Sequence, residues 1–299
     1  MEINPANLQI EVDRFKKGIK KRNPNEFSRL SSVKELDSIR AAIELAYIDT
    51  RRTMRGISKP ENKDYQEIKE KVLENIEIEL YDYFNNQDFP KNFNFSTEHE
   101  KLCNIWHNKF NRIKKDIKAE NKKDSNSNDE YGKTFGTYGK AQKIINMAFK
   151  YLYCCSDAPG CKRDSKYKDH FKYCHMPLDR YTLTWFARDV EKKESKKRKV
   201  NVNEEYSWSN IDNYEEYDSI QKDINDFINS KIDKETYTLS PLELEFLVWP
   251  ESQRHLAAEG FLFGLKDYEK KEKEKVKTKM PLDEKYREII KFLNDNGYK

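Results

Sequence analysis

Apolar residues recur at intervals of three and four along much of the chain, and this spacing restricts the fold more than any other feature. It is clearest between residues 61 and 84, where the stripe is Tyr65, Ile68, Val72, Ile76, Leu80 and Phe84. One face of an α-helix has this period. Glycine and proline, on which turn-dense β-sandwiches and barrels depend, number only 9 each in 299 residues. The sequence therefore predicts helices rather than sheets.

The same spacing, read with start and stop signals, predicts a series of helices. Ser32 to Glu35 fits a capping box before one of them, and Pro177 suits the first turn of another. Aromatic residues make up 13% of the chain and provide material for a core. We predict a mostly α, compact multi-helix protein, with room for a small irregular or short-strand insertion. The predicted helices cover residues 33–54, 61–84, 96–117, 140–153, 177–193, 208–232, 242–249, 254–270 and 281–294.

Residues 119–130 contain no large apolar side chain, and this composition is typical of a linker. We therefore predict an N-terminal helical unit over 1–118, a mobile linker over 119–130 and a C-terminal helical unit over 131–299. The second unit carries a polar loop with cysteine and histidine residues at 154–175.

No apolar run reaches the length of a signal peptide or a membrane span. We expect a soluble, cytoplasmic protein with no membrane partner. Abundant lysine, asparagine and isoleucine are typical of an AT-rich genome, such as that of a low-GC bacterium or its phages.

Soft metal ligands cluster in the 154–175 loop. Cys155, Cys161, Cys174 and His170 are enough for a tetrahedral zinc ion, which binds thiolate and imidazole groups. The spacing contains no C-x-x-C knuckle, so the alternative is that the cysteines pack as small apolar residues. Zinc is the one cofactor that the sequence suggests.

A second group in this region suggests acid–base chemistry. His175 and Asp179 lie four residues apart at a predicted helix start, a spacing at which they can form a catalytic pair or simply cap the helix. Arg163 and His170 are separated by six residues, and this resembles the R-x4-6-H motif of HEPN-type ribonucleases. The resemblance implies that Arg163 holds a phosphate and that His170 helps to move protons.

Basic residues suggest contacts with phosphate groups. Residues Met1 to Arg55 hold 12 Lys and Arg against 8 Asp and Glu, an excess of +4 that equals the net charge of the whole chain. The glycines before the helix at 140 do not have the spacing of a P-loop, but backbone amides at a helix start favour an anion. The predicted nucleic-acid contacts are Lys20, Lys21, Arg51, Arg52, Lys140, Lys143, Lys196 and Arg198, with Tyr131, Tyr138 and Trp185 as rings on which bases stack.

No G-x-S-x-G, H-E-x-x-H, Walker, Rossmann or kinase motif is present, which disfavours the familiar hydrolases, dehydrogenases and kinases. Our leading prediction is a nucleic-acid-engaging protein of a bacterium or phage, extending to a ribonuclease or other nuclease in phage defence or mobile-element biology. The alternatives are a non-enzymatic helical module that binds another protein and a structural module stabilised by zinc. The sequence leaves open whether the chain is an enzyme.

Overall fold

The computed structural model describes residues 3–32, 34–54, 58, 62–86, 94–121, 135–155, 166–190, 207–231 and 238–275. Within 111–121, 166–168 and 259–275 it describes the backbone alone. The predicted helix at 281–294 and most of the predicted linker, 122–130, lie outside these ranges. Helix α5 runs to Asn121, so the first residues of the predicted linker are helical.

The prediction of a mostly α fold is confirmed, because the described residues form ten α-helices and no strand. Short 3-10 turns cover Pro5–Asn7, Arg51–Met54 and Trp208–Asn210, and a π-helical turn covers Phe186–Val190. The α-helices are α1 (Leu8–Arg22), α2 (Pro24–Leu30), α3 (Glu35–Thr50), α4 (Lys63–Asn85), α5 (Phe95–Asn121), α6 (Tyr138–Cys154), α7 (Lys166–Phe171), α8 (Arg180–Trp185), α9 (Tyr214–Lys231) and α10 (Pro241–Lys275).

The chain divides into two compact units, Met1–Leu247 and Val248–Lys299. Helix α10 begins in the first unit and continues through Pro250 into the second. The predicted boundary at 119–130 lies inside the first unit and stays a prediction. Among the described residues, no helix has both the length and the apolar character that a membrane span requires.

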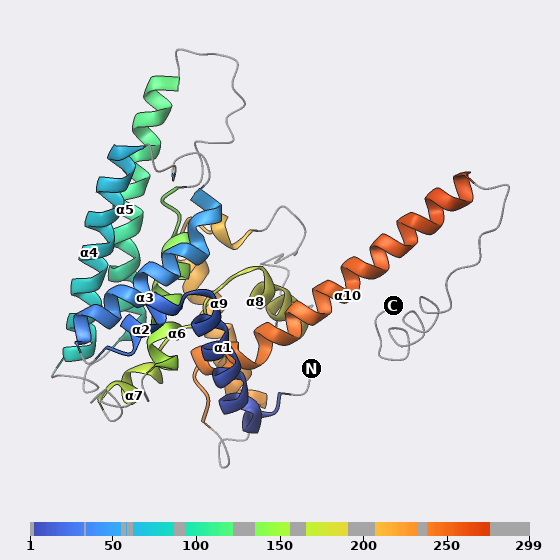
Figure 1. The fold of residues 1–299 in the computed structure, drawn as a ribbon, viewed down its shortest axis with the longest axis horizontal. Helices are drawn as coiled ribbons and strands as arrows, with labels where there is room; N and C mark the ends of the chain where they lie inside the picture. Colours follow the sequence, from blue (N-terminus) through green and yellow to red (C-terminus); the bar gives the residue numbers. More distant parts are fainter. Residues whose placement is uncertain are drawn as a thin grey trace. The chain divides into compact units, whose positions relative to one another are not determined.

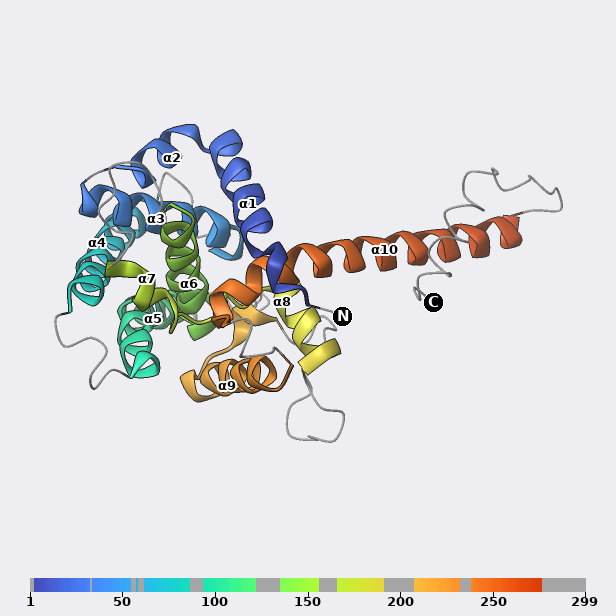
Figure 2. The same ribbon diagram turned by 90° about the horizontal axis from the view of Figure 1, so that it is seen from below.

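Helix α6 lies at the centre of the first unit, with α3 and α5 packed along it (Figures 1 and 2). Helices α4 and α5 pack against each other, and α1 and α9 also contact α6. Residues 139–152 of α6 are all buried. A helix enclosed on all sides has to pair its polar side chains with groups from its neighbours. Helix α6 and its neighbours therefore share a buried polar cluster.

The predicted aromatic core is present. The rings of Trp106 and Phe110 lie 4.1 Å apart, and the hydroxyl groups of Tyr47 and Tyr65 form a buried hydrogen bond of 2.8 Å. A second cluster joins α4 to α6 and α7, with Tyr83 contacting Phe149 edge-on at 5.3 Å and His170 at 5.1 Å. These contacts tie helices far apart in sequence into one core.

Several element boundaries differ from the predictions. The helix predicted from Pro177 begins at Arg180, because Asp179 forms a complete capping box with Thr182. The capping box predicted at Ser32 is absent, and Lys34 is the N-cap of α3. The two helices predicted on either side of residue 250 are one continuous helix. The sequence analysis missed α1 and α2, and it described as irregular the region that contains α7.

Gly139 allows the start of α6 to lie directly against the backbone of residues 208–211. Its N–H donates to the Ile211 carbonyl at 2.9 Å, and the Thr137 hydroxyl donates to the Ser209 carbonyl at 2.6 Å. A Cβ atom at position 139 would lie 1.7 Å from the Trp208 carbonyl oxygen. The backbone at both sides would have to move to accept any side chain.

We expect Gly139→Ala to lower the free energy of unfolding by about 2–3 kcal/mol, since overpacking against backbone is costly. Gly18→Ala in α1 is the matched control, because its Cβ would meet only Arg22 Nη2 at 3.8 Å. That control should raise stability by up to about 1 kcal/mol through helix propensity. Chemical denaturation measures the free energy of unfolding of each variant. Equal stability of the two variants would contradict the packing argument.

Candidate functional site

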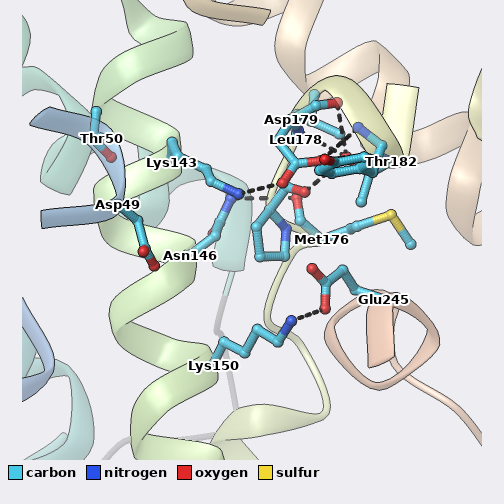
Figure 3. Close-up of polar contacts among 12 residues, drawn as sticks. Asp49, Thr50, Lys143, Asn146, Lys150, Met176, Leu178, Asp179, Thr182 and Glu245 are labelled. Carbon is cyan, nitrogen blue, oxygen red and sulfur yellow. Dashed lines mark hydrogen bonds and ion pairs between the residues drawn. The ribbon is translucent and has the colours of Figure 1, made fainter. Parts of the chain in front are cut away.

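The candidate site is the polar face of α6 together with the groups that neutralise it. Five polar side chains on this helix are buried: Lys140, Gln142, Lys143, Asn146 and Lys150. Burying such groups without partners costs several kcal/mol each, so their partners define the site. Figure 3 shows Lys143 and Lys150 extending from α6 toward Asp179 and Glu245, with Asp49 on the opposite side.

Lys143 pairs with the residue that caps α8. Its Nζ lies 2.8 Å from Asp179 Oδ2, while Asp179 Oδ1 accepts hydrogen bonds from the Tyr181 and Thr182 backbone at 2.9 and 3.0 Å. Burial alone would lower the pKa of Lys143, but the charge of Asp179 outweighs it and the pKa is raised. The lysine therefore stays protonated. Both oxygens of Asp179 are occupied by the fold.

Lys150 forms a second buried ion pair, with Glu245 at the start of α10. Its ammonium group also lies over two aromatic rings, 4.1 Å from the centroid of Phe15 and 4.6 Å from that of Phe246. Such cation–π contacts strengthen when water is excluded. Burial raises the pKa of Glu245, and the charge of Lys150 opposes that rise.

The solvent-facing side of this group is formed by Asp49 in α3. Its carboxylate accepts a 2.5 Å hydrogen bond from the Tyr151 hydroxyl. Burial and the negative charge of Asp49 raise the pKa of Tyr151, so the phenol keeps its proton. Asp49 itself is exposed, whereas the other carboxylates of the cluster are mostly covered.

Two glutamine side chains hold the extended segment 174–179 against α6 and α9. The Gln142 amide accepts from Leu178 N at 3.1 Å and donates to Leu178 O at 2.9 Å. Gln221 makes the same pair of bonds with Met176, at 3.0 and 2.8 Å. Each amide thus substitutes for the neighbouring strand that an extended backbone normally needs.

A neutral histidine network lies next to this segment. His99 and His175 have ring centroids 5.0 Å apart, and His175 Nδ1 lies 3.0 Å from the Tyr217 hydroxyl. Asn146 connects His99 to Tyr217, because its Oδ1 lies 3.0 Å from His99 Nε2 and its Nδ2 donates to the Tyr217 hydroxyl at 2.8 Å. Burial lowers the pKa of His175 to about 3 and also lowers that of His99. Both rings are therefore uncharged at neutral pH.

The predicted catalytic residues occupy separate environments. His175 belongs to the histidine network and Asp179 to the Lys143 pair, while His170 lies among aromatic rings, 5.1 Å from Tyr83. Arg163 lies outside the described residues. Capping, the alternative weighed for Asp179, is what the structure shows. The catalytic roles themselves stay predictions.

The predicted zinc ligands Cys155, Cys174 and His170 are all buried, and Cys161 lies outside the described residues. Burial raises the pKa of the Cys174 thiol, which disfavours the thiolate that zinc requires. In the part of the chain that the structure describes, no three cysteine, histidine or acidic side chains are grouped to hold a metal ion. The zinc site stays a prediction that involves Cys161.

The predicted nucleic-acid contacts separate into two groups. Lys20, Lys21, Arg51 and Arg52 are exposed. Lys140 and Lys143 are only 0% and 6% exposed, so neither presents its ammonium group to a phosphate in solvent, and this corrects the prediction for both. Lys196, Arg198 and Tyr131 lie outside the described residues. Of the predicted stacking rings, Trp185 is buried, and Tyr138 is partly covered and stacks on His107 at 4.3 Å.

The sequence analysis missed Gln142, Asn146, Lys150 and His99 as members of a site. A signal was available, because Gln142, Asn146 and Lys150 follow one another at intervals of four along one stripe of the helix. Polar groups on one stripe of a buried helix indicate interior partners.

Fold and site together define an all-helical unit built around a buried, internally neutralised polar helix. No protein-family model matches the chain, and comparison with curated proteins and with solved structures gives no match either. The functional argument therefore depends on the residues themselves.

The buried pair on α6 gives a stability prediction. Lys150→Met leaves the Glu245 carboxylate buried without its counter-charge and should cost about 3–5 kcal/mol. The double variant Lys150→Met/Glu245→Leu removes both charges and should recover most of that loss. Lys71→Met, which breaks an exposed pair with Glu67, is the control and should leave the unfolding midpoint unchanged. A double variant as unstable as the single one would show that the charges do not act as a pair.

The histidine network gives a pH prediction. Above about pH 6.5 His175 is neutral in both folded and unfolded states, so it contributes no pH dependence. Below that pH His175 binds a proton in the unfolded chain, whereas in the folded state, where its pKa is about 3, it stays unprotonated. The free energy of unfolding should therefore decrease as the pH is lowered from about 6.5 toward 3, by about 1.4 kcal/mol per pH unit for this residue.

We expect His175→Asn to flatten the fall of stability between about pH 6.5 and 4.5, since the amide retains a hydrogen bond to Tyr217 but does not titrate. Tyr217→Phe removes the same hydrogen bond, keeps both histidines and should retain the wild-type slope. Urea denaturation at several pH values measures both. Parallel curves for wild type and His175→Asn would contradict the assignment.

Proposed function

We propose that the protein binds nucleic acid through phosphate contacts at the end of α1. The observation that carries the proposal is a group of four exposed cations within six residues, here called the α1 basic face: Lys17, Lys20, Lys21 and Arg22. Among the described residues, no carboxylate lies within ion-pair distance of any of them. Exposed, unneutralised cations of this density attract polyanions by releasing their counterions.

The surroundings make this group unusual on the described surface. Several exposed lysines on other elements are neutralised by an adjacent acid, as expected for a solvated face of mixed sign. Arg51 and Arg52, at the end of α3, add two further exposed cations that make no ion pair with a described residue. The neutralised lysines include Lys71 with Glu67, Lys101 with Glu79, Lys172 with Asp169 and Lys222 with Asp218.

Binding is favoured over cleavage by the state of the predicted catalytic groups. A general base works best when its pKa lies near the working pH and its nitrogen reaches the substrate. His175 is buried with a pKa of about 3, and both oxygens of Asp179 are occupied by Lys143 and by the start of α8. We therefore propose a nucleic-acid-binding protein and treat nuclease activity as a separate test.

The binding test replaces three lysines of the α1 basic face, in the variant Lys17→Ala/Lys20→Ala/Lys21→Ala. Fluorescence anisotropy with an RNA of about 20 nucleotides should show a loss of affinity of about tenfold or more at low salt. The slope of log Kd against log salt should fall by about 2, because each of the three lysines releases about 0.7 counterions from a single strand.

The matched control is Lys63→Ala/Lys109→Ala/Lys231→Ala. These lysines are exposed, make no ion pair with a described residue and lie on three other helices, so the control removes the same net charge. It should retain affinity within about twofold. Equal weakening of both variants would mean that net charge alone drives binding, and absence of binding by the wild type would end the proposal. Melting curves check that each variant is folded.

A further inference from the structure

We infer that the α1 basic face recognises the sugar–phosphate backbone of nucleic acid without contributing base contacts, so that base identity and base stacking add little to affinity. The inference rests on the proposed function and names the part of the ligand that is recognised. It follows from where the aromatic side chains and the arginine fork of this surface point.

Helix α1 separates its apolar and basic residues onto different sides. Val12 and Ile19 are buried, and its one aromatic ring, Phe15, is half-buried. That ring stacks on Tyr151 at 5.6 Å and meets Phe246 edge-on at 5.6 Å. Non-specific single-strand binders place exposed aromatic rings beside their cations so that bases stack on them. The α1 basic face has no such ring of its own.

The other rings of the described surface do not replace it. Trp185 is fully buried and packs edge-on against Phe227 at 5.3 Å. Tyr138 stacks on His107, and its hydroxyl donates to Asn104 at 2.7 Å. Among the described side chains the one aromatic residue exposed by more than a third is Tyr173, at 42%, and it belongs to the turn after α7.

The cations themselves favour phosphate over base edges. Three of the four are lysines, whose ammonium group is a point charge on a flexible stem and contacts phosphate without a fixed geometry. The common contact that reads guanine is bidentate, and the rigid fork of an arginine fixes its geometry whereas the flexible ammonium group of a lysine does not. Arg22 is the one arginine of the face, and its Nε donates to the Gly18 carbonyl at 3.3 Å. Part of its fork is therefore turned toward its own helix.

The test compares two single strands that differ only in their bases. One is an oligodeoxythymidine of about 20 nucleotides, and the other has the same backbone with abasic tetrahydrofuran residues throughout. We expect the wild-type protein to bind both with Kd values within about twofold, and with equal salt slopes. Stacking of even one base would separate the two ligands by about fivefold or more.

The outcomes separate this inference from the proposed function. Binding of thymidine strands more than about fivefold tighter than abasic strands would overturn the inference while the proposed function stands. Absence of binding to both strands would overturn the inference, and it would overturn the proposed function as well if the RNA of the binding test also failed to bind. The variant Lys17→Ala/Lys20→Ala/Lys21→Ala should lose affinity for both strands by the same factor. A larger loss for the thymidine strand would show that these lysines support base contacts, and would also overturn the inference.

Discussion

The enclosure of α6 is the constraint on which the first unit depends. A helix buried over residues 139–152 has no solvent to satisfy its polar side chains, so each neighbouring element has to supply a matching group. The cap of α8 supplies a carboxylate for Lys143, and Glu245 near the start of α10 supplies one for Lys150. Helices α5 and α9 supply the imidazole and phenol groups that surround Asn146. The positions of these elements are thus fixed by the chemistry of one helix.

The same constraint explains why residues 174–179 are extended instead of helical. An extended chain exposes backbone groups on one side at every second residue, and the two glutamines meet it at positions 176 and 178. A helix beginning at Pro177 would turn the backbone groups of Met176 and Leu178 away from the two glutamines, and the N–H groups of its first turn would have no partner within the helix. The buried Gln221 amide would then lose both of its hydrogen bonds to Met176, which is costly. The capping box at Asp179 then sets the point at which α8 begins.

The sequence predicted α4 and α5 well, because their apolar stripes exceed four turns, whereas it divided α10, the longest described helix, at residue 250. It failed for α1, whose inward face of Val12, Phe15 and Ile19 is short and lies among charged residues. For the site, it singled out Lys143 and Asp179 individually but did not pair them. These two residues are 36 positions apart, and spacing along a chain carries no information about which elements meet in space. The sequence places Gly139 in a glycine-punctuated loop, whereas its role is close backbone contact.

Charge is partitioned between the interior and the surface of the first unit. Inside, Lys143 and Lys150 are each matched by a carboxylate, and the histidines are neutral at neutral pH, so the cluster exerts little field beyond its own contacts. No described carboxylate compensates the α1 basic face, which carries excess positive charge of the N-terminal region. Salt screens exposed charges over about 8–10 Å but barely affects dry ion pairs. Ionic strength therefore acts on the attraction of an anionic ligand while leaving the polar core, and with it the geometry of the unit, almost unchanged.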